Sequence, residues 1–260
     1  MKDYSYLKYL EVCQKAVADD TVFANFRSYV DYVTVVEACG RKLGTAYLKA
    51  ITQDFPHLLY YMPLFHTSDS VGGPAVFYYK KVRRGFSPTT LRYIKVLGDL
   101  EHLFGKLDDM DIIEIGGGYG GQCKIIHDIA KPRSYTIVDL PDALKLSEKY
   151  LDCFEIKDIV FKQPTDDFAN SYSLCISNYA FSEVSYNYQK TYAEKIIKHC
   201  KNGYMTCNHF SRKKTKLMYA LDIFKSCKNK KGEFSPEYPL TGLNNILYTW
   251  TGYKERSSRR

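Results

Sequence analysis

The sequence predicts an α/β fold, in which a Rossmann-like sheet carries helices on both faces and follows an N-terminal helical cap. Three observations predict it. From residue 111 onward, short apolar segments alternate with segments of helical period, as parallel strands joined by crossover helices require. The first apolar segment runs into residues 116–121, where five of six residues are glycine. The second apolar segment ends at an acidic residue, Asp139.

The predicted strands follow one another at regular spacing. We expect them at residues 111–115, 134–138, 159–162, 173–177, 203–207 and 245–251. Helices expected at residues 122–130, 143–151 and 188–200 separate several of these strands. Because strands separated by helices pair in parallel through right-handed crossovers, the sheet should be largely parallel.

The first 65 residues show apolar stripes at helical spacing, which predict helices, one of them over residues 45–53. We expect these helices to form a cap or a homodimer surface. A polar, glycine-rich loop follows, and then a helix that Ser87 caps, Pro88 begins and Gly105 ends. The expected division is a helical extension at residues 1–65 and a ligand-binding domain at residues 66–260.

Composition narrows the class of protein. A chain of 260 residues with 45% hydrophobic content has room for one large domain with a sizeable core. The eight cysteines form no CxxC pair, and no signal segment or membrane-length apolar stretch is seen. These features favour a cytoplasmic protein without a zinc site or membrane insertion. The net charge of +8 could attract nucleic acid or an anionic glycan precursor, although basic clusters of this size are usually solvated loops.

The glycine turn indicates a nucleoside ligand. Glycines between a strand and a helix let the backbone bend sharply and approach a ligand that a Cβ atom would exclude. Gly116, Gly118 and Gly121 fit the GxGxxG pattern of dinucleotide domains. Asp139 follows at the end of the next strand, where a carboxylate accepts hydrogen bonds from ribose hydroxyls. Both NAD and S-adenosylmethionine proteins use that arrangement.

Glu114 distinguishes these two ligands. It lies two residues before the first glycine, inside a predicted central strand, where dinucleotide domains place an apolar residue. Class I methyltransferases commonly carry an acidic residue there, in the pattern ExGxG. A carboxylate buried in a central strand needs polar partners, so its presence favours a dedicated ligand site. The turn therefore favours S-adenosylmethionine as cofactor, with S-adenosylhomocysteine as product.

The stretch at residues 113–122, Ile-Glu-Ile-Gly-Gly-Gly-Tyr-Gly-Gly-Gln, resembles the signature of a family of sugar O-methyltransferases from bacterial and viral glycan-modifying gene sets. Further similar pieces are residues 91–94, 138–141 and 177–183. The resemblance spans residues 60–255 and leaves the first 60 residues unmatched. It implies a class I methyltransferase fold, S-adenosylmethionine as donor, and a sugar hydroxyl of a glycan or glycan precursor as acceptor.

The candidate ligand contacts come just after the strands, because ligands of open parallel sheets bind at the carboxyl ends of the strands. The methionine part is expected on the glycine turn, the ribose after the second strand, adenine after the third and the reacting methyl after the fourth. An arginine before the first strand could pair with the donor carboxylate. The expected cofactor-binding residues are Arg92, Glu114, Gly116, Gly117, Gly118, Tyr119, Asp139, Leu140, Thr165, Asp166, Ser177, Asn178 and Tyr179.

Transfer of a methyl group to a hydroxyl needs a base, because a protonated hydroxyl is a poor nucleophile. His209, just after the fifth strand, is the first candidate, since histidine titrates near neutral pH. Glu183 is the second candidate and Asp69 the third. These three residues could also hold a divalent metal, but nothing in their spacing indicates one, and no metal ligand is assigned.

Three other functions stay open. An RNA ribose or other small-molecule methyltransferase would share the same donor site. An NAD-dependent oxidoreductase is opposed by Glu114. A binding module without catalysis would keep the donor site and transfer no methyl group. The residues after the fourth strand, Ser-Asn-Tyr-Ala, lack the prolines that amino-directed nucleic-acid methyltransferases carry there, which opposes that class and leaves a ribose-directed enzyme open.

Overall fold

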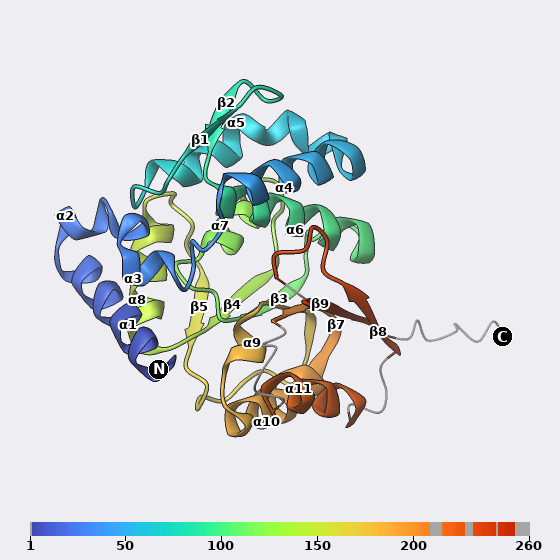
Figure 1. Ribbon diagram of the computed structural model, residues 1–260. Coiled ribbons are helices and arrows are strands. Elements are labelled where there is room, and N and C mark those ends of the chain that lie inside the picture. Colours follow the sequence, from blue (N-terminus) through green and yellow to red (C-terminus); the bar gives the residue numbers. More distant parts are fainter. Residues whose placement is uncertain (1, 209–214, 227–230, 243, 253–260) are drawn as a thin grey trace. The chain divides into compact units, whose positions relative to one another are not determined.

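The structure is a computed structural model that describes residues 2–208, 215–226, 231–242 and 244–252. The chain forms two compact units (Figure 1). The first comprises residues 1–109 and 117–163, and the second comprises residues 110–116 and 164–260. The first 65 residues therefore share a unit with the segment that follows the glycine turn.

The first unit is mainly helical. Its helices are α1 (Lys2–Ala18), α2 (Asp20–Phe23), η1 (Phe26–Ser28), α3 (Val30–Val33), α4 (Arg41–Asp54), η2 (Pro56–Tyr61), α5 (Met62–Phe65), η3 (His66–Ser70), α6 (Pro88–Phe104), α7 (Gly121–His127) and α8 (Pro141–Asp152). Strands β4 (Ser134–Val138) and β5 (Ile159–Lys162) pair in parallel, from Tyr135 opposite Ile159 to Val138 opposite Lys162. A short antiparallel hairpin joins β1 (Phe77–Tyr79) to β2 (Arg84–Phe86).

Helix α6 forms as its sequence predicts. The Ser87 side chain accepts a hydrogen bond from the Thr90 backbone N–H, which satisfies one of the free donors at the helix start. Pro88 occupies the first turn, where its missing N–H costs nothing. The helix ends at Gly105, which has a φ of 81°. Glycine adopts this backbone angle readily, whereas other residues are strained by it. Both predicted boundaries of this helix are confirmed.

The N-terminal helices pack on the rest of the first unit. Helix α1 contacts α8, and α4 contacts α6, so the extension is joined to helices on both sides of the glycine turn (Figure 1). The Lys149 side chain of α8 donates hydrogen bonds to the backbone carbonyls of Ala16 and Val17, at the end of α1. The helices predicted in residues 1–65 are confirmed. The loop predicted at residues 66–74 begins instead with the 3-10 helix η3.

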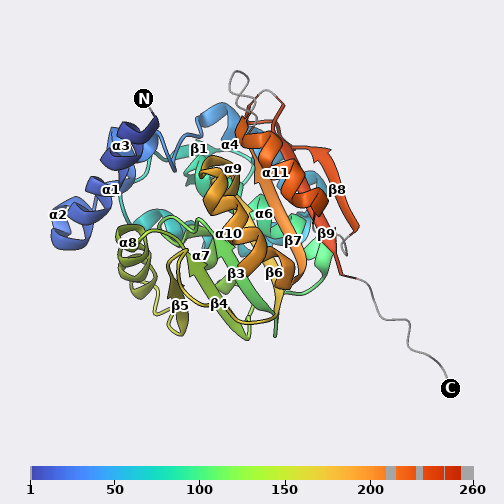
Figure 2. The same ribbon diagram turned by 90° about the horizontal axis from the view of Figure 1, so that it is seen from below.

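The second unit carries strands β3 (Asp111–Ile115), β6 (Tyr172–Asn178), β7 (Cys200–Cys207), β8 (Lys231–Pro236) and β9 (Ile246–Thr251), in the spatial order β3-β6-β7-β9-β8. Strands β3, β6 and β7 run parallel, whereas β9 pairs antiparallel with both β7 and β8. Its helices are α9 (Ala180–Glu183), α10 (Tyr186–Lys195), η4 (Ile197–His199) and α11 (Thr215–Ser226). Helices α10 and α11 lie side by side (Figure 2).

The sheet core explains why these strands form where the apolar segments predict. Ile112, Ile113, Leu174 and Ile176 are fully buried, as expected for parallel strands covered on both faces. The predicted α/β, Rossmann-like fold class is confirmed. Strand β8, helix α11 and the β1–β2 hairpin were not predicted. Within the part of the chain that the structure describes, no helix combines the length and apolar character needed to cross a membrane.

Candidate functional site

The glycine turn that follows β3 uses backbone conformations that favour glycine. Gly116, Gly118 and Gly120 have φ values of 78°, 57° and 85°. A Cβ atom on Gly116 would lie 2.0 Å from the Cβ atom of Ala180, and one on Gly120 would lie 2.7 Å from the Ser147 Oγ. Side chains at these two positions are therefore excluded both by backbone strain and by close packing.

Gly118 differs from its neighbours because the space beside it is open. A Cβ atom there would approach only the Cγ1 atom of Val36, at 3.9 Å. The backbone N–H of Gly118 donates a 3.0 Å hydrogen bond to Asp139 Oδ2, and the Leu140 N–H donates one of 2.8 Å to Asp139 Oδ1. The carboxylate at the end of β4 is thus fixed next to a side-chain-free bend, as the sequence predicts.

The Asp139 carboxyl is partly buried, and burial destabilises its charged form. Burial raises its pKa from 3.8 to about 6, although the hydrogen bonds from Leu140 and Gly118 lower it. Each carboxylate oxygen has two lone-pair sites, so each can accept a further hydrogen bond besides its backbone donor. An ionised carboxylate with spare acceptor sites suits a pair of ribose hydroxyls.

Helix α1 extends to this carboxylate. Burial raises the pKa of the Cys13 thiol to about 12; a hydrogen bond from Tyr9 opposes that rise, and the negative charges of Asp139 and Asp142 add to it. The Gln14 side chain also donates a 2.8 Å hydrogen bond to Asp142, in the first turn of α8. The N-terminal extension, which matched no family by sequence, therefore lies within electrostatic range of Asp139.

Tyr119 is buried among aromatic side chains of the first unit. Its ring is fully buried and packs edge-on against Phe26 and Tyr150, with centroid distances of 5.8 and 4.7 Å. The Arg27 guanidinium lies 4.7 Å from the ring centroid, a cation–π contact. The sequence placed Tyr119 against the methionine part of the donor, but this burial gives its side chain a structural role.

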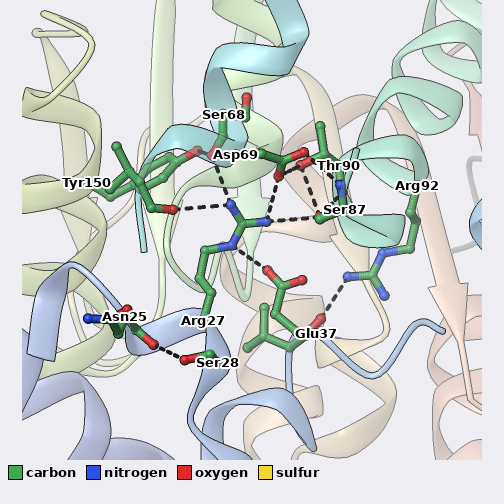
Figure 3. A network of polar contacts seen from close by, with 12 residues as sticks. Asn25, Arg27, Ser28, Glu37, Ser68, Asp69, Ser87, Thr90, Arg92 and Tyr150 are labelled. Atoms are coloured by element: carbon green, nitrogen blue, oxygen red, sulfur yellow. Dashed lines mark hydrogen bonds and ion pairs between the residues drawn. The ribbon is translucent and has the colours of Figure 1, made fainter. Parts of the chain in front are cut away.

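The fully buried Arg27 holds a polar network in the first unit (Figure 3). Its Nε pairs with Glu37 Oε1 at 2.6 Å, and one terminal nitrogen donates to the Ser68 carbonyl at 2.8 Å. The other terminal nitrogen contacts Asp69 Oδ1 at 3.3 Å and Ser87 Oγ at 3.1 Å. One cation therefore joins η1, the segment after α3, η3 and the start of α6.

Asp69, the third candidate base, belongs to this network. Besides Arg27, its carboxylate accepts hydrogen bonds of 2.7 Å from the Ser87 N–H and from the Thr90 hydroxyl. Its side chain is 2% exposed. A carboxylate buried in an ion pair at a helix start stabilises the scaffold and has no access to an acceptor. These contacts favour a structural role for Asp69 over the catalytic role expected from the sequence.

Arg92, proposed from the sequence to pair with the donor carboxylate, holds the backbone of the extension. Its terminal nitrogens donate to the Val36 carbonyl at 3.2 Å and to the Cys39 sulfur at 3.7 Å. These contacts fix the segment that borders the open side of Gly118.

The second unit brings three predicted residues to the end of β6. Ser177 is fully buried; its hydroxyl donates to the Ile115 carbonyl at 3.0 Å and accepts from the Phe181 N–H at 3.1 Å. The side-chain nitrogen of Asn178 is buried and has no hydrogen-bond partner among the described residues. Glu114 is 2% exposed and lies opposite Ile176 in the β3–β6 pairing, which confirms that its strand is buried.

Tyr179 adopts a left-handed backbone, with φ of 70°, a conformation that is rare for a bulky residue. Its phenolic oxygen donates a hydrogen bond to Glu237 Oε1, just beyond β8. The other oxygen of Glu237 accepts from the Thr241 hydroxyl at 2.6 Å and from Asn245 Nδ2 at 3.0 Å. The Glu237 carboxylate, which is 7% exposed, therefore forms a hydrogen bond with the Tyr179 side chain just after β6.

The same network extends to the end of β7. The amide oxygen of Asn208 accepts a 3.2 Å hydrogen bond from Asn245 Nδ2, and its amide nitrogen donates to Glu183 Oε1. Glu183 is exposed, so this candidate base is accessible to solvent. His209, the first candidate, lies outside the described residues. The Thr165 and Asp166 carbonyls each accept a 3.2 Å hydrogen bond from the Lys195 side chain.

Two further features of the described residues bear on ligand binding. Over residues 2–208, 215–226, 231–242 and 244–252, no group of three histidine, cysteine or acidic side chains is placed to hold a metal ion. A concavity of about 220 Å³ lies at the amino end of β5, lined by Glu148, Asp152 and Lys157 among others. Ligands of parallel sheets bind at the opposite, carboxyl ends of the strands, where Asp139 lies. We therefore do not assign this concavity to the ligand.

No protein-family model matches this chain, and no curated protein sequence matches it. Among solved structures it is similar to an rRNA methylase from Streptococcus thermophilus, with 12% identity over 57% of this chain and 90% of that chain, and a TM-score of 0.45. It is also similar to N-methyltransferase NodS from Bradyrhizobium japonicum WM9 in complex with S-adenosyl-L-homocysteine, with 11% identity over 64% and 88% of the two chains and a TM-score of 0.48. These likenesses carry no activity or substrate over to this chain.

Proposed function

We propose that the protein is an S-adenosylmethionine-dependent O-methyltransferase that acts on a sugar hydroxyl. One observation carries the donor assignment: an ionisable carboxylate, Asp139, is held by two backbone N–H groups beside the open, side-chain-free bend at Gly118. The buried Glu114 before this turn favours S-adenosylmethionine over NAD. The donor, when bound, supplies a methyl group on a positively charged sulfur.

The residues present fit this donor. The open space at Gly118 is a cradle that even one added carbon would begin to fill. Asp139 offers charge-assisted acceptors for both ribose hydroxyls. In the second unit, the Asn178 side-chain nitrogen is a buried donor that lacks a hydrogen bond in the described chain, which a ligand oxygen would satisfy.

Within this proposal, each residue has a task of its own. Glu114, Gly116 and Gly117 shape the turn, and Leu140 packs against the nucleoside. Thr165 and Asp166 contact the adenine amino group. Arg92 and Tyr119 act through the scaffold, since their side chains already hold the extension against the turn.

The sugar acceptor is supported by the resemblance of residues 113–122 and 177–183 to sugar O-methyltransferases. His209 stays the proposed base that accepts the hydroxyl proton, with Glu183 as the second candidate. Histidine suits this task because its ordinary pKa lies near neutral pH.

Two experiments test the proposal. Isothermal calorimetry should detect binding of S-adenosylhomocysteine and none of NADH; the reverse result would identify an oxidoreductase. Incubation with labelled S-adenosylmethionine and a panel of free sugars, nucleotide-linked deoxyhexoses and oligosaccharides should label one acceptor class. Donor binding with no labelled compound would indicate a binding module instead.

RNA ribose is the second candidate acceptor, and the β1–β2 hairpin favours it. The turn of this hairpin exposes Lys80, Lys81 and Arg83, next to an exposed Tyr78. Cations beside an exposed aromatic ring suit phosphates and stacked bases. Labelling of a single-stranded RNA that weakens steeply with salt, without labelling of any glycan, would select this acceptor.

A further inference from the structure

The end of β6 contains a residue whose conformation costs free energy. Tyr179 has a φ of 70°, and a bulky residue in this region is strained, so the surrounding contacts must hold it there. Its backbone is held on both sides: its N–H donates to the Thr206 carbonyl at 2.9 Å, and its carbonyl accepts from the Ser182 hydroxyl at 2.7 Å. The strain directs the phenol toward Glu237.

Glu237 adds a second cost, because a carboxylate at 7% exposure loses most of its hydration. Its partners among the described residues are neutral: the Tyr179 phenol, Thr241 and Asn245. No lysine or arginine forms an ion pair with it in the described chain. A carboxylate that accepts a hydrogen bond from a phenol is also placed to take the phenol's proton when the phenol accepts another one.

The location of the pair points to the acceptor. Tyr179 follows β6 and Asn208 follows β7, and the carboxyl ends of parallel strands are where ligands of such sheets bind. The Tyr179 phenolic oxygen also lies 3.3 Å from Thr241 Oγ1. A phenolic oxygen both donates and accepts hydrogen bonds, so it can accept from a substrate hydroxyl while it donates to Glu237. An acceptor hydroxyl that donates to Tyr179 would therefore be connected through the phenol to the Glu237 carboxylate.

We propose that Tyr179 and Glu237 form a proton relay for the acceptor hydroxyl, with Tyr179 as a catalytic residue and Glu237 as the final proton acceptor; this rests on the proposed methyltransferase function. As the acceptor oxygen bonds to the methyl carbon, the carbon–sulfur bond breaks and its electron pair stays on the neutral thioether. The acceptor O–H bond breaks as its proton moves to the Tyr179 oxygen. The phenol's own proton passes to Glu237, which becomes neutral.

Asn208 and Asn245 position this relay. Asn245 Nδ2 bridges Glu237 Oε2 and the Asn208 amide oxygen, at 3.0 and 3.2 Å. Asn208 in turn donates to the exposed Glu183. Glu183 therefore orients the network from the solvent side. In this relay the buried Glu237 takes the proton in place of His209 or Glu183, the two bases expected from the sequence.

The test compares Tyr179→Phe and Glu237→Gln with a control, Tyr188→Phe, which removes the hydroxyl of a 44%-exposed tyrosine on α10. Transfer is followed with labelled S-adenosylmethionine and the acceptor found in the panel, at pH 5–9. We expect kcat to fall at least 100-fold in both relay variants, while affinity for S-adenosylhomocysteine stays within twofold. Tyr188→Phe should match the wild type in both kcat and affinity.

A second readout needs no acceptor. With ¹³C-labelled tyrosine ring carbons, Tyr179→Phe identifies the Tyr179 Cζ resonance, and Glu237→Gln should shift that resonance in the folded protein. If the Tyr179 Cζ resonance does not shift in Glu237→Gln, the hydrogen bond between Tyr179 and Glu237 is refuted. Wild-type kcat in both variants, or a loss confined to His209→Ala, overturns the relay but leaves the methyltransferase proposal in place. Loss of donor binding in the wild type would instead remove the proposed function.

Discussion

Replacing Asp139 with asparagine should stabilise the unliganded protein at neutral pH while destroying donor binding. Burial raises the pKa of Asp139 from 3.8 to about 6, so the folded state binds this proton more tightly than the unfolded chain. Stability due to this group is therefore lost as the pH rises through this range and is regained as the pH falls. At one pKa unit per 1.4 kcal/mol, the full penalty of the charge is about 3 kcal/mol.

The measurable change in the free energy of unfolding is smaller than this penalty, because water reaches the partly buried Asp139 side chain. The pH range of the measurement also covers only part of the titration. Between pH 4.5 and 7.5, the free energy of unfolding of Asp139→Asn relative to the wild type should rise by about 1–2 kcal/mol. Asparagine also loses a hydrogen bond to Gly118 or Leu140, at a cost of about 1 kcal/mol that does not depend on pH. The slope with pH separates the two effects. The Asp128 carboxyl, whose pKa burial also raises to about 6, titrates equally in both proteins and cancels.

The assay is urea unfolding followed by circular dichroism across this pH range, with calorimetry of S-adenosylhomocysteine in parallel. Loss of two charge-assisted hydrogen bonds to ribose should weaken donor binding at least 100-fold in the variant. Wild-type affinity should fall roughly tenfold for each pH unit below about 6, because the protonated carboxyl is a weaker acceptor. A stability difference that is constant with pH, or that favours the wild type more at pH 7.5, would refute the reasoning.

Three further predictions concern the scaffold and the surface. Arg27→Met should lower the free energy of unfolding by about 3–5 kcal/mol in urea, because two buried carboxylates lose their cation; a loss below about 1 kcal/mol would contradict the buried network. Gly118→Ala should lower the free energy of unfolding by only about 1–2 kcal/mol but weaken S-adenosylhomocysteine binding at least tenfold. The control is Gly105→Ala, because Gly105 also has a positive φ and open space beside it. This variant should lose stability and keep its donor affinity. Replacing Lys80 and Lys81 with glutamate should leave methyl transfer to a neutral glycan unchanged, and a rate that drops with these charges would point to a polyanionic acceptor.

Local signals made much of the fold predictable. Strands β3, β4 and β5 have the predicted bounds, because each is a short apolar run that ends at a glycine, an acidic residue or a polar segment. Helix α6 has the predicted ends because a capping serine, a first-turn proline and a terminal glycine act within a few residues.

The polar networks were not predictable in the same way, since their partners are distant in sequence. Asp69 looked like a loop carboxylate available for catalysis; its partner Arg27 lies 42 residues earlier, and nothing near either residue indicates the pair. Glu237 was missed because β8 was missed, and it meets Tyr179 across 58 residues. A lone glutamate after an unrecognised strand has no local pattern that could distinguish it from a surface residue.

The contact between Arg27 and the Tyr119 ring carries a consequence for the evolution of this chain. An aromatic residue in the glycine-rich bend and a cation in the N-terminal helices support one another, so a change at one position alone would leave a void or an unbalanced charge. Among descendants of a common ancestor, the two positions should change together. The N-terminal helices would then be inherited together with the glycine-rich bend, and replacing them with an unrelated segment would destabilise that bend.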